Sequence, residues 1–225
     1  MWNIWGIALL AVHICVVSGS GRSLFSNTTI GANTTSHLPA VYPWDKLLDQ
    51  SFYFYEAQRS GKLPEAHKIL WRGDSALKDL GPKGEDLSGG HYNNGGFLKN
   101  VFPYASTTST IAWGVLEFKQ AYKDAEVYDE ALDHLKWAAK FLLACHIEQD
   151  LYVAAIGMNR FDYPQWSRPE DMHERRPVYI VDSGMSSSDL LGSASAGLTA
   201  VSLVFKEENS TFAYECLVKA QALYA

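Results

Sequence analysis

The chain has 225 residues, of which 47% are hydrophobic and 20% charged, and its formal net charge is −6 at pH 7. This length allows one domain or two small ones with a large core, and the composition is too hydrophobic and too weakly charged for a disordered chain. Acidic residues outnumber Lys and Arg by 25 to 19, which argues against nucleic acid as the main partner.

The first twenty residues have the pattern of a cleaved signal peptide, although basic residues are missing before the apolar run. That run extends from Ile7 to Val17, and the small residues Ser18, Gly19 and Ser20 follow it. It is too short to span a bilayer comfortably. No later segment reads as apolar for long enough to cross a membrane, so we expect a secreted, extracellular protein without membrane contact after cleavage.

Residues 21–41 form a polar leader rich in Ser, Thr, Asn and Gly. The leader holds two N-x-[ST] acceptor tripeptides, at Asn27 and Asn33, and a third occurs at Asn209. Two acceptors directly behind a signal peptide predict a glycosylated, extended leader.

From residue 44 onward, apolar residues mostly recur every three or four positions, which is the spacing of amphipathic helices. Cys145 and Cys216 lie within such patterns, where they could pair in an oxidising compartment or remain buried free thiols. Strand alternation and tandem repeats are absent, so the predicted class is all-α. Helices are predicted over Trp44–Arg59, Thr107–Tyr122 and Asp129–His146, from Ser188–Asp189 to Phe205, and from Ser210–Thr211 to Ala222.

Two long stretches between the predicted helices are irregular. Residues 71–103 are rich in Gly, Asp, Asn and Pro, and residues 150–187 are similar. Loops of this length are uncommon in compact domains unless they carry function. We therefore expect a helical scaffold whose functional residues lie in two elaborate loops.

The motifs in these loops resemble those of a known enzyme family. The first loop reads D-L-S-G-G-H-Y-N-N-G-G from Asp86 to Gly96 and is followed by Lys99 and F-P; the second reads W-S-R-P-E-D-M from Trp166 to Met172. In this order they resemble glycoside hydrolase family 9, the cellulases that include animal endoglucanases. The corresponding family motifs are D-L-[ST]-G-G-Y-Y-D-A-G-D and W-G-R-P-E-D-M, and the resemblance is collinear from about residue 42 to the last residue.

The resemblance implies an (α/α)6 barrel of the six-hairpin glycosidase type, with a substrate cleft across one end. It also implies that residues 42–225 cover only about the first half of the catalytic domain. The implied partner is a β-1,4-glucan polysaccharide, with no cofactor.

The residues expected to perform catalysis are replaced in this chain. An inverting glycosidase needs a carboxylate base and a carboxylic acid ~6.5–9.5 Å apart. In the family both aspartates of D-A-G-D serve the attacking water, and here their positions hold Asn93 and Gly96. The family's acid is a glutamate near the far end of the domain, beyond residue 225. An amide and a glycine cannot replace a base, so we expect impaired hydrolysis.

Other loop carboxylates are weak candidates for a substitute base. Glu170 lies beside Arg168, which predicts a structural salt bridge between them. Asp86 is expected to hold its loop through backbone hydrogen bonds. The loop carboxylates are Glu85, Asp86, Asp162, Glu170 and Asp171.

Sugar binding depends on other residues. The 7 Trp and 12 Tyr residues fit a bulky core but also suit sugar rings. Trp166 stands at the family's cleft tryptophan, and Tyr163 replaces the histidine of the family's D-H-x-x-W. Tyr92 and Arg168 complete the predicted substrate-binding set, while packing of the second loop is the alternative role of Trp166.

No required metal is predicted. The seven histidines lack zinc-ligand spacing. Asp182, Ser188 and Asp189 offer oxygens that could suit calcium, but Ser193 replaces a glutamate of calcium-binding relatives. Asp189 is instead expected to cap a helix.

Three hypotheses therefore remain open from the sequence. The first is a secreted endo-β-1,4-glucanase-like chain, partial and catalytically impaired. The second is a non-catalytic β-glucan-binding protein that keeps the cleft, and the third is a truncated gene product.

Overall fold

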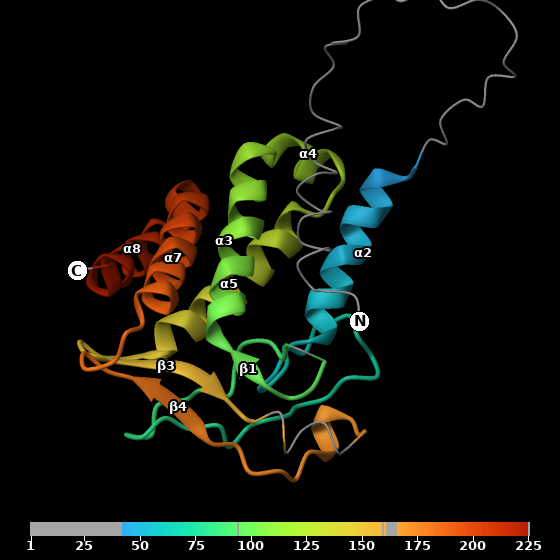
Figure 1. Ribbon diagram of the computed structural model, residues 1–225. Coiled ribbons are helices and arrows are strands. Elements are labelled where there is room, and N and C mark those ends of the chain that lie inside the picture. Colours follow the sequence, from blue (N-terminus) through green and yellow to red (C-terminus); the bar gives the residue numbers. More distant parts are fainter. Residues whose placement is uncertain (1–41, 94, 159, 161–165, 225) are drawn as a thin grey trace, which may run out of the picture.

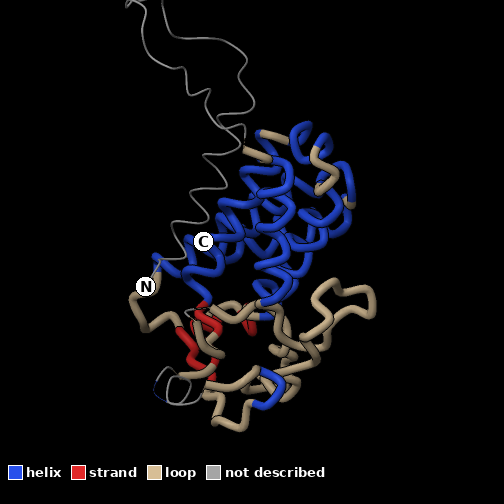
Figure 2. Tube along the Cα trace, turned by 90° about the vertical axis from the view of Figure 1, so that its right-hand side faces the viewer, coloured by secondary structure: helices blue, strands red, loops and turns tan. Residues whose placement is uncertain are grey.

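The helices of the protein pack together, and its strands and long loops gather at one end of them (Figures 1 and 2). The computed structural model describes residues 42–93, 95–158, 160 and 166–224. The predicted signal peptide and leader, together with Asn27, Asn33, Asp162 and Tyr163, lie outside these residues.

The predicted helices are confirmed, with shifted ends. α3 begins at Val101, six residues before the predicted start, with Pro103 in its first turn, where a missing N–H needs no partner. The backbone departs from helical geometry at Phe118 (φ −122°), so the predicted end of this helix is a separate element, α4. The helices are α2 (Trp44–Ala57), α3 (Val101–Glu117), α4 (Lys119–Asp124), α5 (Tyr128–Ala144), α7 (Ser188–Glu208), α8 (Ser210–Tyr224) and the short 3-10 helix η1 (Pro169–Asp171).

The helix starts differ from the sequence prediction in detail. Asp189 does not cap α7; Ser187 is the N-cap and makes no side-chain capping bond, while Asp189 lies in the first turn, where its charge suits the helix dipole. α8 has its cap one residue before the predicted start, because Asn209 Oδ1 accepts a hydrogen bond from Phe212 N at 3.1 Å.

A small antiparallel sheet, which the amino-acid sequence did not predict, accompanies the helices. Its strands are β1 (Lys99–Asn100), β2 (His146–Glu148), β3 (Leu151–Ile156) and β4 (Val178–Val181). β3 pairs with each of the other three, with Lys99 opposite Ile156 and Tyr152 opposite Val181. Two of these strands have only two or three residues, and β3 is a continuous apolar run rather than an alternating one. The sheet joins the start of α3 to the end of α5 and to the second loop.

The centre of the core lies where α3 packs against α5 and α7. Leu135 and Leu142 of α5 and Leu198 of α7 are fully buried there. Gly197 lets α3 and α7 approach closely, because a methyl group at this position would lie 3.0 Å from the Ala105 carbonyl oxygen. α7 also packs along α8, which leaves one face of α8 exposed.

Both cysteines within the described residues are buried free thiols. Burial raises the pKa of Cys145 well above its ordinary value and raises that of Cys216 to about 12. Both thiols are therefore kept protonated and unreactive. This outcome agrees with the second of the two alternatives predicted from the sequence, that the cysteines remain buried free thiols.

α7 is long and apolar enough to cross a membrane by length and composition, alone among helices of the described residues. The expectation that no such segment follows the signal peptide was therefore wrong. Half of its apolar window is buried, including Leu198 and Val201. This burial is the pattern of a core helix.

A buried ion cluster fixes the first loop to the sheet and to the second loop. Lys99 is fully buried at the start of β1, and its Nζ donates to the carbonyl oxygens of Leu87, Ser88 (3.2 Å) and Gly89 (3.0 Å). The same Nζ lies 2.8 Å from Asp79 Oδ2. A single ammonium group thus binds four oxygens of the first loop.

Arg176 of the second loop completes the cluster. Its Nε and Nη2 donate to the two carboxylate oxygens of Asp79 at 2.8 and 2.9 Å, and its Nη1 donates to Phe97 O at 2.6 Å. Burial lowers the pKa of Lys99 to about 8, although the Asp79 carboxylate opposes this shift. We call Asp79, Lys99 and Arg176 the buried ion cluster.

Removing the ammonium group should destabilise the whole loop end. We expect Lys99→Met to lower the free energy of unfolding by about 3–5 kcal/mol, because three carbonyl groups lose their donor in a buried site. Urea unfolding followed by circular dichroism measures this change. The control is Lys83→Met, which removes a half-exposed lysine paired with Glu148 and should change stability by less than about 1 kcal/mol. Equal losses in both variants would contradict the role of the cluster.

Candidate functional site

Asp86 holds a turn of the first loop through a backbone hydrogen bond, as predicted. Asp86 Oδ1 accepts a hydrogen bond from Ser88 N at 2.9 Å, and the hydrogen bonds from Ser88 lower the pKa of Asp86. Ser60 Oγ donates to Ser88 O at 2.6 Å, which fixes the turn to the end of α2. Asp86 therefore holds the loop and is not poised as a base.

Asn93, at the first of the two expected aspartate positions, closes the second part of the loop. Its Nδ2 donates to Asn100 O at 2.9 Å, and its Oδ1 accepts from Asn100 N at 3.1 Å. Its backbone N–H donates to Leu98 O at 2.9 Å. The donor and the acceptor of the Asn93 side chain are thus both hydrogen-bonded to the backbone of Asn100, the residue that precedes α3. Gly96, at the second position, is half-buried and has no side chain.

The position of Tyr92 does not fit the predicted contact with substrate. Its side chain is only 4% exposed, and its hydroxyl donates to Ser75 Oγ at 2.9 Å. Burial raises the pKa of Tyr92 to about 12. Its ring packs against Phe97 and under the guanidinium of Arg176, so it supports the loop from inside.

Trp166 and Arg168 lie on the surface of the second loop. Trp166 is fully exposed, so both faces of its indole are open to a ligand. Arg168 forms an ion pair with Asp171 at 2.9 Å across η1. The predicted pair between Arg168 and Glu170 is therefore wrong, because η1 turns the two side chains toward different partners.

Glu170 instead connects the two loops. Its Oε1 accepts from Arg72 Nε at 2.7 Å and from Gly73 N at 2.8 Å. Burial alone would raise the pKa of Glu170, but these hydrogen bonds outweigh it and lower the pKa. An ionised carboxylate that accepts two hydrogen bonds suits a structural role, as predicted, and is a poor general acid.

The oxygen atoms considered for calcium serve the backbone. Asp182 Oδ1 accepts from Gly184 N at 2.9 Å, and Asp189 Oδ1 accepts from Leu190 N at 2.8 Å. Within the described part of the chain, no group of three or more His, Cys, Asp or Glu side chains is placed to hold a metal ion. The calcium hypothesis gains no support from this arrangement.

A pair of buried histidines, His91 and His134, which the amino-acid sequence did not predict, lies behind the loop. His91 Nδ1 lies 3.0 Å from the Tyr104 hydroxyl, and the His91 ring lies against the His134 ring at a tilt of 46°, with 4.9 Å between the centroids. Burial lowers the pKa of His91 far below its ordinary value and lowers that of His134 to about 3, and the nearby Arg59 adds to both shifts. The available signal was that His91 replaces a tyrosine of the family motif.

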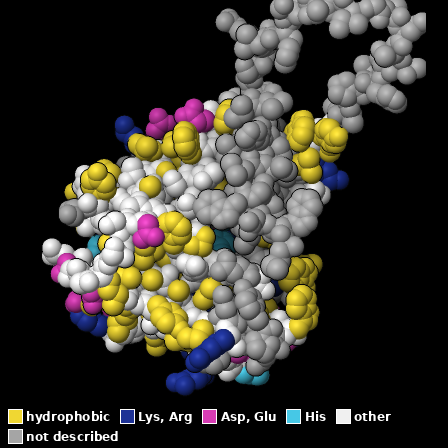
Figure 3. Space-filling model, viewed as in Figure 1, with side chains coloured by type: hydrophobic (Ala, Val, Ile, Leu, Met, Phe, Trp, Pro, Cys, Tyr) yellow, Lys and Arg dark blue, Asp and Glu magenta, His cyan; other side chains and the backbone are white. Residues whose placement is uncertain are grey.

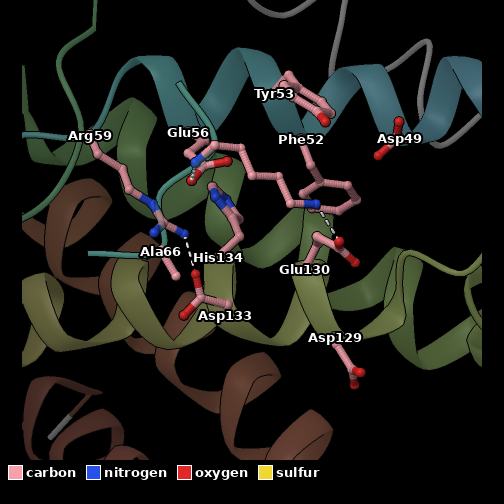
Figure 4. Close-up of a pocket in the computed structure, with 11 residues that line it drawn as sticks. Asp49, Phe52, Tyr53, Glu56, Arg59, Ala66, Asp129, Glu130, Asp133 and His134 are labelled. Carbon is pink, nitrogen blue, oxygen red and sulfur yellow. Dashed lines mark hydrogen bonds and ion pairs between the residues drawn. The ribbon is translucent and has the colours of Figure 1, made fainter. Parts of the chain in front are cut away.

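A cleft of about 240 Å3 between α2 and α5 opens next to this pair (Figure 4). Phe52 and His134 point into it from opposite helices, and Arg59 crosses it to form an ion pair with Asp133 at 2.6 Å. The cleft is lined by residues of α2, α5 and the segment 59–68, so it is separate from the loop that holds Asn93.

The histidine pair predicts acid sensitivity. Because the unfolded chain binds protons near pH 6.5 and the folded His134 only near pH 3, the folded state loses stability as the pH falls through this window. We expect His134→Phe to reduce this loss by up to about 1.4 kcal/mol per pH unit. Urea midpoints between pH 7 and 4.5 measure the slope. His173→Phe, at an exposed position, controls for removing a histidine. An unchanged slope in the His134 variant would contradict the prediction.

Comparisons with known proteins agree with the motifs. Residues 44–225 match glycosyl hydrolase family 9. The chain is 39% identical to Endoglucanase A of Bacillus pumilus over 186 residues, which cover 83% of this chain and 28% of that protein. It is 36% identical to Endoglucanase 15 of Arabidopsis thaliana over 211 residues, covering 94% of this chain and 41% of the relative.

Solved structures show the same relationship. An endoglucanase from the termite Nasutitermes takasagoensis superimposes with a TM-score of 0.80 at 39% identity, over 81% of this chain and 42% of that one. The cellulase Cel9M of C. cellulolyticum, in complex with cellobiose, gives 0.78 at 28% identity, over 81% and 43%.

These endoglucanases are (α/α)6 barrels, so the predicted fold class is confirmed, with the small sheet at the loop end as an addition. The chain spans 28% to 41% of the length of the curated relatives named above. With its motifs in order, its helices in place and this family match over nearly all described residues, the chain belongs to glycosyl hydrolase family 9.

Proposed function

We propose that this chain is a secreted endo-β-1,4-glucanase-like protein that binds β-1,4-glucan but hydrolyses it poorly. Family membership and the endoglucanase names of its relatives support the substrate class. A related cellulase was solved with cellobiose, a short β-1,4-glucan. The impairment is a property of this chain's own loop.

The double hydrogen bond between Asn93 and Asn100 carries the proposal of impairment. Inverting hydrolysis needs a carboxylate that removes a proton from the attacking water. The Asn93 amide has no basic oxygen, and its donor and acceptor both bind the Asn100 backbone. Gly96 supplies no second carboxylate to support the water. General-base catalysis contributes about 10²–10⁴-fold, so turnover should be reduced by at least this factor.

Restoring both carboxylates tests this proposal. In a form of the protein that extends to the family's distal glutamate, we expect Asn93→Asp with Gly96→Asp to raise the release of reducing ends from soluble cellulose by about 10²–10⁴-fold, because both the base and the acid are then present. The matched control is Asn93→Ser with Gly96→Ser, which changes the same positions without adding a carboxylate and should stay at the wild-type level. Robust turnover by the wild-type protein would contradict the proposed impairment.

Non-catalytic glucan binding is the second candidate function, and the full exposure of Trp166 favours it. The apolar face of a pyranose ring can stack on an exposed indole, and this contact needs no base. Arg168 lies two residues away, and because only its Nε and Nη2 bond to Asp171, the N–H groups of Nη1 can donate to sugar hydroxyls. The exposed aromatic ring supplies the apolar contact.

We expect Trp166→Ala to weaken retention on insoluble cellulose about tenfold, through the loss of one stacking contact. The depletion of protein from solution over a series of cellulose concentrations measures the affinity. The matched control is Trp113→Ala, because Trp113 is 65% exposed on α3, outside the two loops. Failure of the folded wild-type protein to bind cellulose would contradict the binding proposal.

The predicted secretion implies glycosylation of exposed acceptors. Asn209 is exposed between α7 and α8, and its cap uses only Oδ1, so a sugar on Nδ2 is compatible with the helix start. We expect the secreted protein to lose mass on treatment with an N-glycosidase, and Asn209→Gln to remove one glycan. An unmodified Asn209 in secreted protein would contradict this assignment.

A further inference from the structure

The loop after α2 displays two large apolar side chains on a tight turn. Arg72 N donates to Ile69 O at 2.9 Å, which closes a turn with Leu70 and Trp71 at its centre. Ile69 and Arg72 are 7% and 5% exposed, whereas Leu70 and Trp71 are 92% and 68% exposed. Figure 3 shows hydrophobic side chains at the right-hand edge of the molecule, over the loop that follows α2.

This Leu70–Trp71 turn is held rigidly. Arg72 donates to the carbonyl oxygens of Ala57 and of Arg59 (3.0 Å), and so ties the turn to the end of α2. It also pairs with Glu170 at 2.7 Å. An exposed indole on an anchored turn loses little conformational entropy when it binds a ligand. The rigid support therefore suits an exposed indole that contacts a ligand.

The same anchor connects this turn to the second loop. Glu170 accepts from both Arg72 and Gly73, and it lies four residues after Trp166. Trp71 lies two residues before Gly73, so the reach of the chain alone keeps the backbones of the two tryptophans within ~30 Å. The pair between Arg72 and Glu170 thus joins the two loops that carry these exposed indoles.

We propose that Trp71, with Leu70 beside it, is a second glucan-binding platform that extends the surface formed by Trp166. This inference rests on the proposed glucan-binding function. A β-1,4-glucan repeats the same apolar ring face along its length, so separate aromatic platforms can hold one long chain. Two such contacts on a single ligand add affinity through effective concentration, and a disaccharide cannot use both.

The test compares binding of cellohexaose by calorimetry and retention on insoluble cellulose, in the longest natural form of the protein. We expect Trp71→Ala to weaken both about tenfold, and Trp71→Tyr to recover most of the loss because it restores an aromatic face. Trp113→Ala, which removes a tryptophan of nearly equal exposure from α3, should bind as the wild type does. Circular dichroism and the urea midpoint should remain unchanged in all three variants.

The outcomes separate the two proposals. If Trp166→Ala weakens binding and Trp71→Ala does not, the second platform is wrong and the proposed function stands. If Trp71→Ala instead changes the oligomeric state or the stability, the turn is a protein contact and the inference is overturned. If the folded wild-type protein binds neither ligand, the proposed function fails and the platform fails with it.

Discussion

The loop end of this protein depends on one buried carboxylate. Asp79 is 2% exposed and lies between the ammonium group of Lys99 and the guanidinium of Arg176. A lone charge could not remain ionised in such a place, so each partner makes the burial of the others possible. Because Asp79 and Lys99 come from the first loop and β1, and Arg176 from the second loop, this cluster joins the two loops, as the pair between Arg72 and Glu170 also does. The carbonyl groups of Leu87, Ser88 and Gly89 then fix the turn before the catalytic positions.

The two sets of ion pairs that hold the loops together do not involve the positions of the residues that perform catalysis in an inverting glycosidase. Neither Asn93 nor Gly96 contributes to the buried ion cluster or to the pair between Arg72 and Glu170. Asn93 instead makes its own local closure with Asn100. An aspartate there would place a carboxylate against the Asn100 carbonyl oxygen, so the amide suits the observed loop better than the acid does. An amide at position 93 is thus compatible with the fold and suits this conformation of the loop.

The amino-acid sequence predicted the helices well because their periodic apolar faces pack against one another. It failed where long-range pairing decides the structure. β1 and β2 are too short to show any alternation, and β3 is apolar on both faces. The ion-pair partner predicted for Glu170 was wrong for the same reason. Arg168 is its neighbour in sequence, but Glu170 pairs with Arg72, which lies almost a hundred residues away.

The assignment of Asn93 and Gly96 to the two aspartate positions needs only residue identity in the motif, and it stays a prediction. The predicted contacts with substrate depend on geometry as well. Whether an aromatic residue faces solvent depends on packing, which the motif does not record. Tyr92 and Trp166 both lie in family motifs, yet one is buried beneath Arg176 and the other is fully exposed.

This contrast separates binding from turnover in physical terms. Turnover needs two carboxyl groups placed within narrow limits of distance and pKa, so the replacement of the base alone lowers it by about 10²–10⁴-fold. Stacking needs only exposed aromatic faces on rigid supports, and the pair between Arg72 and Glu170 provides a support for both loops without using any catalytic group. The residues that support the exposed indoles are therefore different from those at the aspartate positions, and a different ion pair, between Arg72 and Glu170, holds them.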